Sequence, residues 1–510
     1  MQEMKKALQL SVIVSCGLLV LLFFLVVYGH LFSNGLGAAD DAFIAIVAKN
    51  FSMGYGYAYS GIANETDGIF LFHPGINTGP PLILPAAGLI KLFGTHPWVP
   101  GLVTPTISIL ILLLILQQTI TRYGWGRSLL FITLMIGFSY LFTTRRLFAL
   151  WFSLLGEIPS VLLSILGTIL LVAHDQKKTK MIVGSLLLGL AVQTKMIALL
   201  TAIPVLIMFL THVLKKSPIN KNKAAFIALS LGFFMAPFIL FEIWKVAILG
   251  ITGYEEHLFT TVRAFKIVHG IPPLFTGYAL PKMLLERSEI LHNHFGCGIP
   301  FLLAGLIILS ILIYRYGKKD FSQQFCYILF ISAFLHLTWW LLFSNGNPRY
   351  ALMGIFLYFT AVSGVVFLTW KRMLILAVTG VFAIWMIAFN PGFFNRVLFL
   401  VKFQFDYSPR VKNLIRTASF LEGLKNDHKN VLFVSGWWAS CTDLDFILPE
   451  VENLKRFDRL IISDFHKDII LVRNTRWETI YHVPGMKEWA ETKTKILWEA
   501  PPYVLSRLQQ

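Results

Sequence analysis

Two adjacent carboxylates, Asp40 and Asp41, follow the first long apolar run of the chain and open a stretch rich in glycine and aromatic residues. Paired carboxylates suit a site in which one acid is the general base for an acceptor hydroxyl and the other orients a partner group or a metal ion. The simpler alternative is a pair of acids in a solvated loop. The segment at 42–51, however, has the pattern of an amphipathic helix, which would hold both acids against a membrane surface. We therefore expect the pair to be catalytic.

Other candidate residues lie at the ends of apolar runs. Glu157 opens one such run, Lys195 lies between two of them, and Arg349 precedes a third. A charge beside an apolar run is costly unless it faces a polar cavity, although Lys195 and Arg349 could also be ordinary interfacial side chains. Three further candidates lie in polar stretches, where a lone histidine is more often not a ligand: His73, His257 and Arg263.

The composition is that of a membrane protein. Of the 510 residues 56% are hydrophobic and only 14% are charged, whereas about 25% are charged in an average soluble domain. Repeated apolar runs of roughly 17 to 25 residues predict transmembrane helices. The net charge of +17 comes largely from short basic clusters beside these runs, which is typical of cytoplasmic loops rather than of a nucleic-acid-binding surface. We therefore expect no nucleic-acid partner.

The basic clusters also predict the topology. Placing them in the cytoplasm gives about 11 spans with the N-terminus inside and the C-terminus outside. A first outer loop then covers 33–100 and contains the acid pair, and a second large outer loop covers 250–297. The apolar run at 82–93 is too short for a span and is preceded and interrupted by prolines, so we expect a re-entrant or interfacial helix there; a span is the alternative.

The composition changes after Asn390, where the chain becomes charged and shows no further span. Short β-branched or apolar runs at 431–436 and 460–463 and a helix-like segment at 411–424 predict a small extracytoplasmic α/β domain over 391–510. The preceding 1–390 would form the catalytic membrane domain. Cys297 and Cys441 would both be extracytoplasmic and could pair, although two unpaired thiols are the simpler expectation.

Several motifs of 1–390 together resemble the GT-C glycosyltransferases, in the branch of the protein mannosyltransferases and aminoarabinose transferases. The motifs of the first outer loop are Asp40-Asp41-Ala42-Phe43-Ile44, Ala48-Lys49-Asn50, Gly54-Tyr55-Gly56-Tyr57, His73-Pro74-Gly75 and Thr78-Gly79-Pro80-Pro81-Leu82. The later motifs are Gly156-Glu157-Ile158-Pro159, Gly189-Leu190-Ala191-Val192-Gln193-Thr194-Lys195, Glu256-His257 with Arg263, and Pro348-Arg349-Tyr350.

The resemblance implies a polytopic α-helical GT-C fold and a reaction. Such enzymes move a sugar from a polyprenyl-phosphate donor in the membrane lipids to a glycan, lipid or protein acceptor, here at the outer face of the plasma (inner) membrane. The resemblance implies that Asp40 is the general base and that Asp41 stands at a position where the family often has glutamate. It makes Lys195, Arg263 and Arg349 the ligands of the donor phosphate, and it associates His257 with a metal.

One departure from the family leaves metal dependence open. Thr78-Gly79 stands where the aminoarabinose branch has a Glu-Lys pair, so a metal-binding acid and a phosphate-binding lysine are missing. A divalent metal is therefore possible, and we expect no other cofactor. The chain contains neither G-x-x-x-x-G-K nor G-x-G-x-x-G, in keeping with a donor that carries no nucleotide.

Two alternatives remain open. In a transporter or lipid flippase, Glu157 and Lys195 would line a path through the membrane together with Glu242 and Lys245. A transporter would place its essential charges near mid-membrane and would need no large outer domain. A noncatalytic assembly subunit is the other alternative, and it would tolerate substitution of the acid pair.

Overall fold

The computed structural model describes residues 2–37, 40–60, 69–141, 145–172, 178–215, 221–269, 280–295, 321–369, 407–427, 431–435, 441–449, 454–456, 467–474 and 494–508. The chain forms two compact units. The first unit comprises Met1–Val26, Thr106–Trp151 and Gly156–Lys402, and the second comprises Val27–Pro105, Phe152–Leu155 and Phe403–Gln510.

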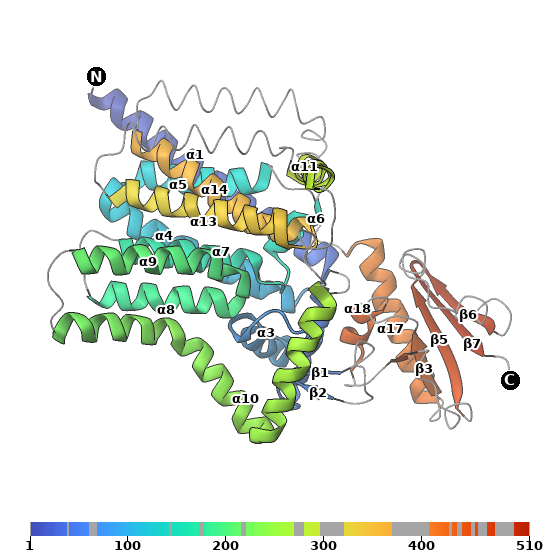
Figure 1. Cartoon of the computed structure of the whole chain (residues 1–510). Helices are drawn as coiled ribbons and strands as arrows, with labels where there is room; N and C mark the ends of the chain where they lie inside the picture. Colours follow the sequence, from blue (N-terminus) through green and yellow to red (C-terminus); the bar gives the residue numbers. More distant parts are fainter. Residues whose placement is uncertain are drawn as a thin grey trace. The chain divides into compact units, whose positions relative to one another are not determined.

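Long apolar helices dominate the first unit (Figure 1). Two of them, α1 Gln2–Asn34 and α4 Val103–Tyr123, belong partly to the second unit. The others are α5 Trp125–Leu141, α7 Glu157–Val172, α8 Lys178–Thr194, α9 Leu199–Lys215, α10 Lys221–His269, α13 Phe321–Phe343 and α14 Pro348–Thr369. Shorter helices are α6 Arg145–Phe148 and α11 Leu280–Phe295, with 3-10 turns at Ala149–Trp151 and Met196–Ala198.

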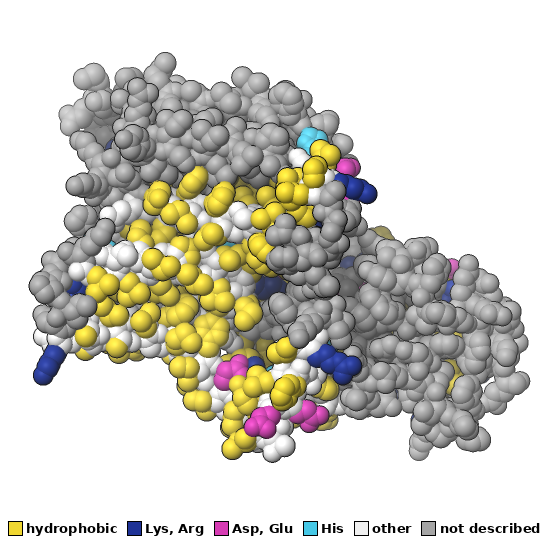
Figure 2. Space-filling model, viewed as in Figure 1, with side chains coloured by type: hydrophobic (Ala, Val, Ile, Leu, Met, Phe, Trp, Pro, Cys, Tyr) yellow, Lys and Arg dark blue, Asp and Glu magenta, His cyan; other side chains and the backbone are white. Residues whose placement is uncertain are grey.

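The chain is a polytopic α-helical membrane protein, as the composition predicts. Within the described parts of the chain, five helices are long and apolar enough to cross a membrane. Hydrophobic side chains cover the face that α9, α10 and α13 present in Figure 2. The predicted spans at 298–314 and 373–389 lie outside the described residues, so the number of spans stays a prediction.

Glycines let α7 and α8 pack closely. A Cβ on Gly167 would lie 2.9 Å from the carbonyl oxygen of Gly184, and a Cβ on Gly184 would meet that of Gly167 at the same distance. Gly189 of α8 meets the backbone of α10 in the same way, because its Cβ would lie 2.2 Å from the Phe234 carbonyl oxygen. Small residues at such crossings allow backbones to approach, which brings the ends of these helices together.

A sharp bend divides α10 at Gly250, which has φ +71° and ψ 173° (Figure 1). This is the residue at which the sequence predicts the span to end and the second outer loop to begin. The bend is bridged by Glu242, whose carboxylate accepts hydrogen bonds from Lys245 at 2.8 Å and from Tyr254, beyond the bend, at 2.9 Å. The described parts of this predicted loop are helical, because they form the end of α10 and α11.

The second unit combines the first predicted loop with the C-terminal segment. The first part contains α2 Asp40–Ser52, a hairpin of β1 Ala58–Tyr59 and β2 Phe70–Leu71, α3 Pro80–Phe93 and a 3-10 turn at Pro100–Leu102. The C-terminal part contains α17 Pro409–Asp427, α18 Thr442–Ile447 and the strands β3 Val431–Ser435, β4 Lys455–Arg456, β5 Asp468–Asn474, β6 Thr494–Ala500 and β7 Tyr503–Leu508.

The C-terminal strands form one mixed sheet in the order β4-β3-β5-β7-β6. The β3 strand is parallel to β4 and β5, whereas β7 is antiparallel to β5 and β6. The predicted small α/β region is therefore confirmed, with its helix at 411–424 inside α17 and its strand at 431–436 as β3. The strand predicted at 460–463 and Cys297, with its possible link to Cys441, lie outside the described residues.

The helices of the first loop differ in how well the sequence predicts them. The α3 helix has 14 residues, so it spans only about 21 Å, less than the roughly 30 Å of a hydrocarbon core. It is thus a short helix, as expected. The expectation of an amphipathic surface helix at 42–51 is wrong, because every residue of α2 from Asp41 to Asn50 is buried, including Lys49.

Candidate active site

A buried charged cluster joins three of the predicted residues in the first unit. The Nζ of Lys195 lies 3.4 Å from Oε1 of Glu157, and Nε of Arg349 lies 4.0 Å from the same oxygen. The side chains of Glu157, Lys195 and Arg349 are 1%, 6% and 14% exposed. Two cations thus lie beside one carboxylate in a buried place, an arrangement that suits the binding of an anionic ligand.

Each member of the cluster lies at a helix end. Glu157 begins α7, where a carboxylate is stabilised by the helix dipole. Lys195 follows the last residue of α8 and has an extended backbone before the next turn. Arg349 is the second residue of α14, and its backbone N–H donates to the Asn347 side chain at 3.2 Å. The three charged side chains therefore start from positions where helices begin or end. The glycine contacts of α8 fix the positions of α7 and α8.

The carboxylate of Glu157 retains unused capacity as an acceptor. Across the described residues, neither of its buried oxygens accepts a hydrogen bond with good geometry, although both cations lie within ion-pair distance of Oε1. Buried polar atoms without such partners are uncommon in folded proteins and mark functional positions. The cluster thus resembles a site for a polar ligand more than a finished structural ion pair.

A second arginine supports the turn that leads to Arg349. The Nη2 atom of Arg287 in α11 donates to the carbonyl oxygen of Ser344 at 2.9 Å, and its guanidinium lies 5.4 Å from the ring centroid of Trp340. The indole N–H of Trp340 in turn donates to the carbonyl oxygen of Asn347 at 2.9 Å. The turn between α13 and α14 is therefore held from both sides.

Gly346 is required for this arrangement, so we expect Gly346→Ala to disrupt it. Gly346 has φ +83°, and a Cβ built on it would lie 1.1 Å from Nη1 of Arg287. The substitution should lower the free energy of unfolding by about 1–3 kcal/mol and weaken lipid-phosphate binding, since Arg349 follows the turn. Thermal unfolding in detergent and titration with undecaprenyl phosphate would measure both effects.

Gly232→Ala in α10 is the matched control for that experiment. No atom lies within 4 Å of the position its Cβ would take, so the substitution should be neutral or should stabilise the helix by about 0.5–1 kcal/mol. Equal behaviour of the two variants would contradict the role of Gly346.

The acid pair lies in the second unit, at the start of α2. Asp41 is buried, and its two oxygens accept the backbone N–H groups of Gly37 at 2.9 Å and Leu154 at 2.6 Å. Asp41 therefore holds two backbone segments together. Asp40 is only partly buried, so of the two acids it is the one whose position suits proton transfer.

Aromatic side chains surround His73 in the same unit. The ring centroids of Phe43, Tyr59 and Phe70 lie 5.6, 5.6 and 5.2 Å from that of His73. The Nδ1 atom of His73 accepts the backbone N–H of Gly75 at 3.0 Å, so the neutral ring carries its proton on Nε2. Phe43 lies three residues beyond Asp40 on α2, and this places the aromatic group near the acid on one helix face.

The remaining predicted residues lie on the part of α10 beyond the bend and are not part of the ion-pair cluster. Arg263 is exposed, and His257 is buried near Glu242 and Lys245. No group of three or more His, Cys, Asp or Glu side chains that could hold a metal ion occurs in the described portions of the chain. The phosphate role of Arg263 and the metal role of His257 stay predictions.

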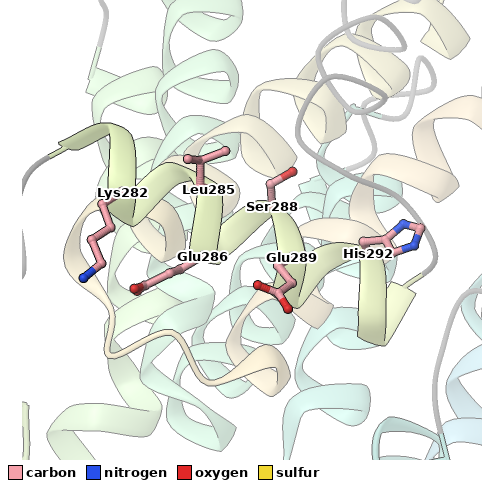
Figure 3. Close-up of a pocket in the computed structure, with 6 residues that line it drawn as sticks. All are labelled: Lys282, Leu285, Glu286, Ser288, Glu289 and His292. Carbon is pink, nitrogen blue, oxygen red and sulfur yellow. The ribbon is translucent and has the colours of Figure 1, made fainter.

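A surface hollow on α11 contains none of the predicted residues (Figure 3). It is lined along one side of this helix by Lys282, Leu285, Glu286, Ser288, Glu289 and His292. Its mixed charge does not favour an anion, so we place the candidate active site elsewhere.

Sequence reasoning missed the buried polar residues that join the two parts of the second unit. Lys49 of α2 donates to the carbonyl oxygens of Asp445 at 3.0 Å and of Leu448. Arg410 of α17 donates to the carbonyl oxygen of Leu36 at 3.3 Å. No local pattern could reveal them, because the partners are 374 to 399 residues apart in the chain.

Comparison with known proteins identifies the fold. No family model matches the sequence, and no curated protein matches it by sequence. Among solved structures, ArnT from Cupriavidus metallidurans bound to undecaprenyl phosphate matches with a TM-score of 0.57 and 11% identity over 96% of each chain. The Archaeoglobus fulgidus oligosaccharyltransferase in the apo form matches with a TM-score of 0.53 and 13% identity over 93% of this chain and 70% of that one.

These matches extend beyond the segment in which the sequence motifs lie. A coverage of 96% includes most of 391–510, to which the resemblance in sequence contributed little. At such low identity the likeness concerns the fold. The chain thus has the GT-C fold of membrane glycosyltransferases that its motifs predict.

Proposed function

We propose that this protein is a glycosyltransferase that moves a sugar from a polyprenyl-phosphate donor to a hydroxyl of an envelope glycan, lipid or protein. The observation that carries the proposal is the buried Glu157 cluster, in which two cations, Lys195 and Arg349, lie together at the ends of membrane helices. ArnT, which shares the fold, has been solved bound to undecaprenyl phosphate. A lipid phosphate matches the charge of the cluster and its membrane setting.

The reaction would be a direct displacement. The acceptor oxygen forms a bond to the anomeric carbon of the sugar while the bond from that carbon to the phosphate oxygen breaks. Asp40 takes the proton of the acceptor hydroxyl, and the bonding electrons leave with the lipid phosphate. Attack opposite to the leaving group inverts the anomeric centre.

Cations stabilise the charge that develops on the leaving phosphate. Lys195 and Arg349 serve this purpose in the proposal, with Arg263 as a further ligand. Glu157 orients the two buried cations and accepts hydrogen bonds from the ligand. Asp41 holds the backbone around Asp40, and His73 with its aromatic neighbours offers a surface on which a sugar ring can stack. If a divalent metal takes part, His257 would be one of its ligands and the metal would neutralise phosphate charge.

We propose the outer face of the plasma (inner) membrane as the site of the reaction. The N-terminus would be cytoplasmic, and the acid pair and the C-terminal segment would be extracytoplasmic, since the basic clusters favour cytoplasmic loops. The transporter alternative gains no support from α10, because Glu242 accepts hydrogen bonds from Lys245 and Tyr254 within that helix.

Mass spectrometry of the envelope from a deletion strain tests the proposal directly. We expect one sugar to disappear from a glycan, glycolipid or glycoprotein, and the identity of the missing sugar would name the donor. Undecaprenyl phosphate at a concentration of 100 times its Kd should also stabilise the purified protein by about 2.7 kcal/mol, which a shift in Tm would show. An unchanged envelope together with an unchanged Tm would refute the proposal.

A further inference from the structure

The C-terminal segment contacts the backbone just before the acid pair. The Nη2 atom of Arg410, in the first turn of α17, lies 3.3 Å from the carbonyl oxygen of Leu36 and 3.0 Å from Oδ2 of Asp443. The hydroxyl of Tyr503 in β7 donates to the same Oδ2 at 2.7 Å. One nitrogen atom of Arg410 thus connects the C-terminal core with the chain that leads to Asp40.

Two members of this network are buried. Asp443 is almost fully buried and Tyr503 is completely so. Burial, together with the charge of Asp443, raises the pKa of Tyr503, so its hydroxyl remains a donor. Burial acts to lower the pKa of Arg410, but the charges of Asp443 and Asp41 and the hydrogen bond to Asp443 outweigh it and raise that pKa. Arg410 therefore stays charged.

The peptide that Arg410 contacts is fixed on both sides. The backbone N–H of Leu36 donates to the carbonyl oxygen of Pro97 at 2.8 Å, and that of the next residue, Gly37, donates to Asp41 at 2.9 Å. With Arg410 on the carbonyl oxygen of Leu36, this peptide has little freedom to rotate. Because Gly37 donates to Asp41 in the first turn of α2, the orientation of this peptide is tied to the start of that helix.

The other end of α2 is also held by the C-terminal segment. Lys49 is 1% exposed and donates to the carbonyl oxygens of Asp445 and Leu448, and Thr95 donates to that of Ile447 at 3.1 Å. These carbonyls belong to the last turn of α18, where a helix leaves carbonyl groups without partners and its dipole attracts a cation. The C-terminal segment therefore fixes both ends of the helix that carries the acids.

We propose that the C-terminal segment is part of the catalytic apparatus, with Arg410 as a positioning residue that sets the direction of Asp40 through the carbonyl oxygen of Leu36. The inference rests on the proposed function, because Asp40 must be the base for its direction to matter. It gives the C-terminal segment a role in catalysis rather than in attachment or acceptor choice alone.

The test uses a charge-neutral pair of substitutions. Arg410→Met with Asp443→Asn removes both charges, so no unpaired charge remains buried. Hydrogen–deuterium exchange of the purified full chain should rise in peptides covering 36–43. Sugar transfer in the complemented deletion strain should fall on the order of 10- to 100-fold, since a small misplacement of a catalytic group costs this much. Undecaprenyl phosphate binding should be unchanged.

The same two types of substitution at an ion pair within the sheet are the control. Arg507 and Asp468 form an ion pair at 2.8 Å between β7 and β5, and Arg507→Met with Asp468→Asn should leave both exchange and transfer as in the wild type. The Arg410→Lys variant should retain most of the transfer. A single nitrogen atom of Arg410 makes both contacts, and lysine also offers one such atom.

The outcomes separate the positioning role of Arg410 from the proposed glycosyltransferase function. If exchange in 36–43 stays at the control level, or if the Arg410 pair transfers sugar as well as the control pair, the positioning role is overturned. If the wild type itself restores no sugar to the deletion strain, the proposed function fails. The exchange measurement then still decides whether Arg410 holds this segment.

Discussion

Replacing Asp40 with asparagine is expected to reduce sugar transfer on the order of 10²- to 10⁴-fold, which is the contribution of a general base. Asparagine has the same shape but cannot accept the proton of the acceptor hydroxyl. The side chain is partly exposed at the start of α2, so the loss of its charge should cost only about 0.3–1 kcal/mol of stability. Transfer measured by mass spectrometry and unfolding in detergent would give both values.

Asp41→Asn provides the contrasting variant. Both oxygens of Asp41 accept backbone N–H groups, whereas an asparagine side chain offers one acceptor and would turn an NH₂ group toward the other N–H. We expect a loss of about 1–3 kcal/mol in the free energy of unfolding. If Asp40→Asn transfers sugar at the rate of the wild type, Asp40 is not the base.

Replacing Lys195 with methionine should produce the largest loss of stability. The side chains of Lys195 and Glu157 are both almost fully buried, and removal of Lys195 takes away the nearer of the two cations beside this buried carboxylate. Breaking such a pair costs about 3–5 kcal/mol. Binding of undecaprenyl phosphate should weaken as well, because one of the two cations beside Glu157 is gone. Unfolding in detergent with and without the lipid measures both effects.

A second substitution separates stability from binding. Glu157→Gln alone keeps both cations but removes the carboxylate beside them, so the free energy of unfolding should fall while lipid-phosphate binding is retained. Lys245→Met is the matched control, since Lys245 pairs with Glu242, which is 41% exposed, and such a pair contributes about 0–1 kcal/mol. Lipid binding by Lys195→Met with the affinity of the wild type would show that Lys195 does not hold the phosphate.

Much of the helical architecture follows from local patterns in the sequence. Hydropathy and basic clusters predict the membrane helices, and Gly250 marks the bend in α10 because a positive φ suits glycine. The prolines before α3 and its length of 14 residues identify it as a short helix. The motifs containing Glu157, Lys195 and Arg349 also predict residues that meet in one cluster.

The sequence does not reveal which charged side chains contact segments that are far away in the chain. Lysine is rarely buried, so Lys49 gives no sign that it satisfies the end of α18, and α2 therefore looks amphipathic when it is enclosed on all sides. Arg410 and Asp443 likewise look like surface charges of the helices they belong to. Arg287 supports a turn 57 residues later in the chain, and its own surroundings in the sequence do not indicate this contact. Each of these contacts joins segments that no local periodicity relates.

The contact between Lys49 and α18 also sets the order of events during biosynthesis. The lysine leaves the ribosome 396 residues before its partner Asp445, which at about 5–20 residues per second is a delay on the order of 20–80 seconds. During this interval α2 lacks the carbonyl groups that accept hydrogen bonds from Lys49. The contacts that enclose the end of α2 can therefore form only after α18 has been made.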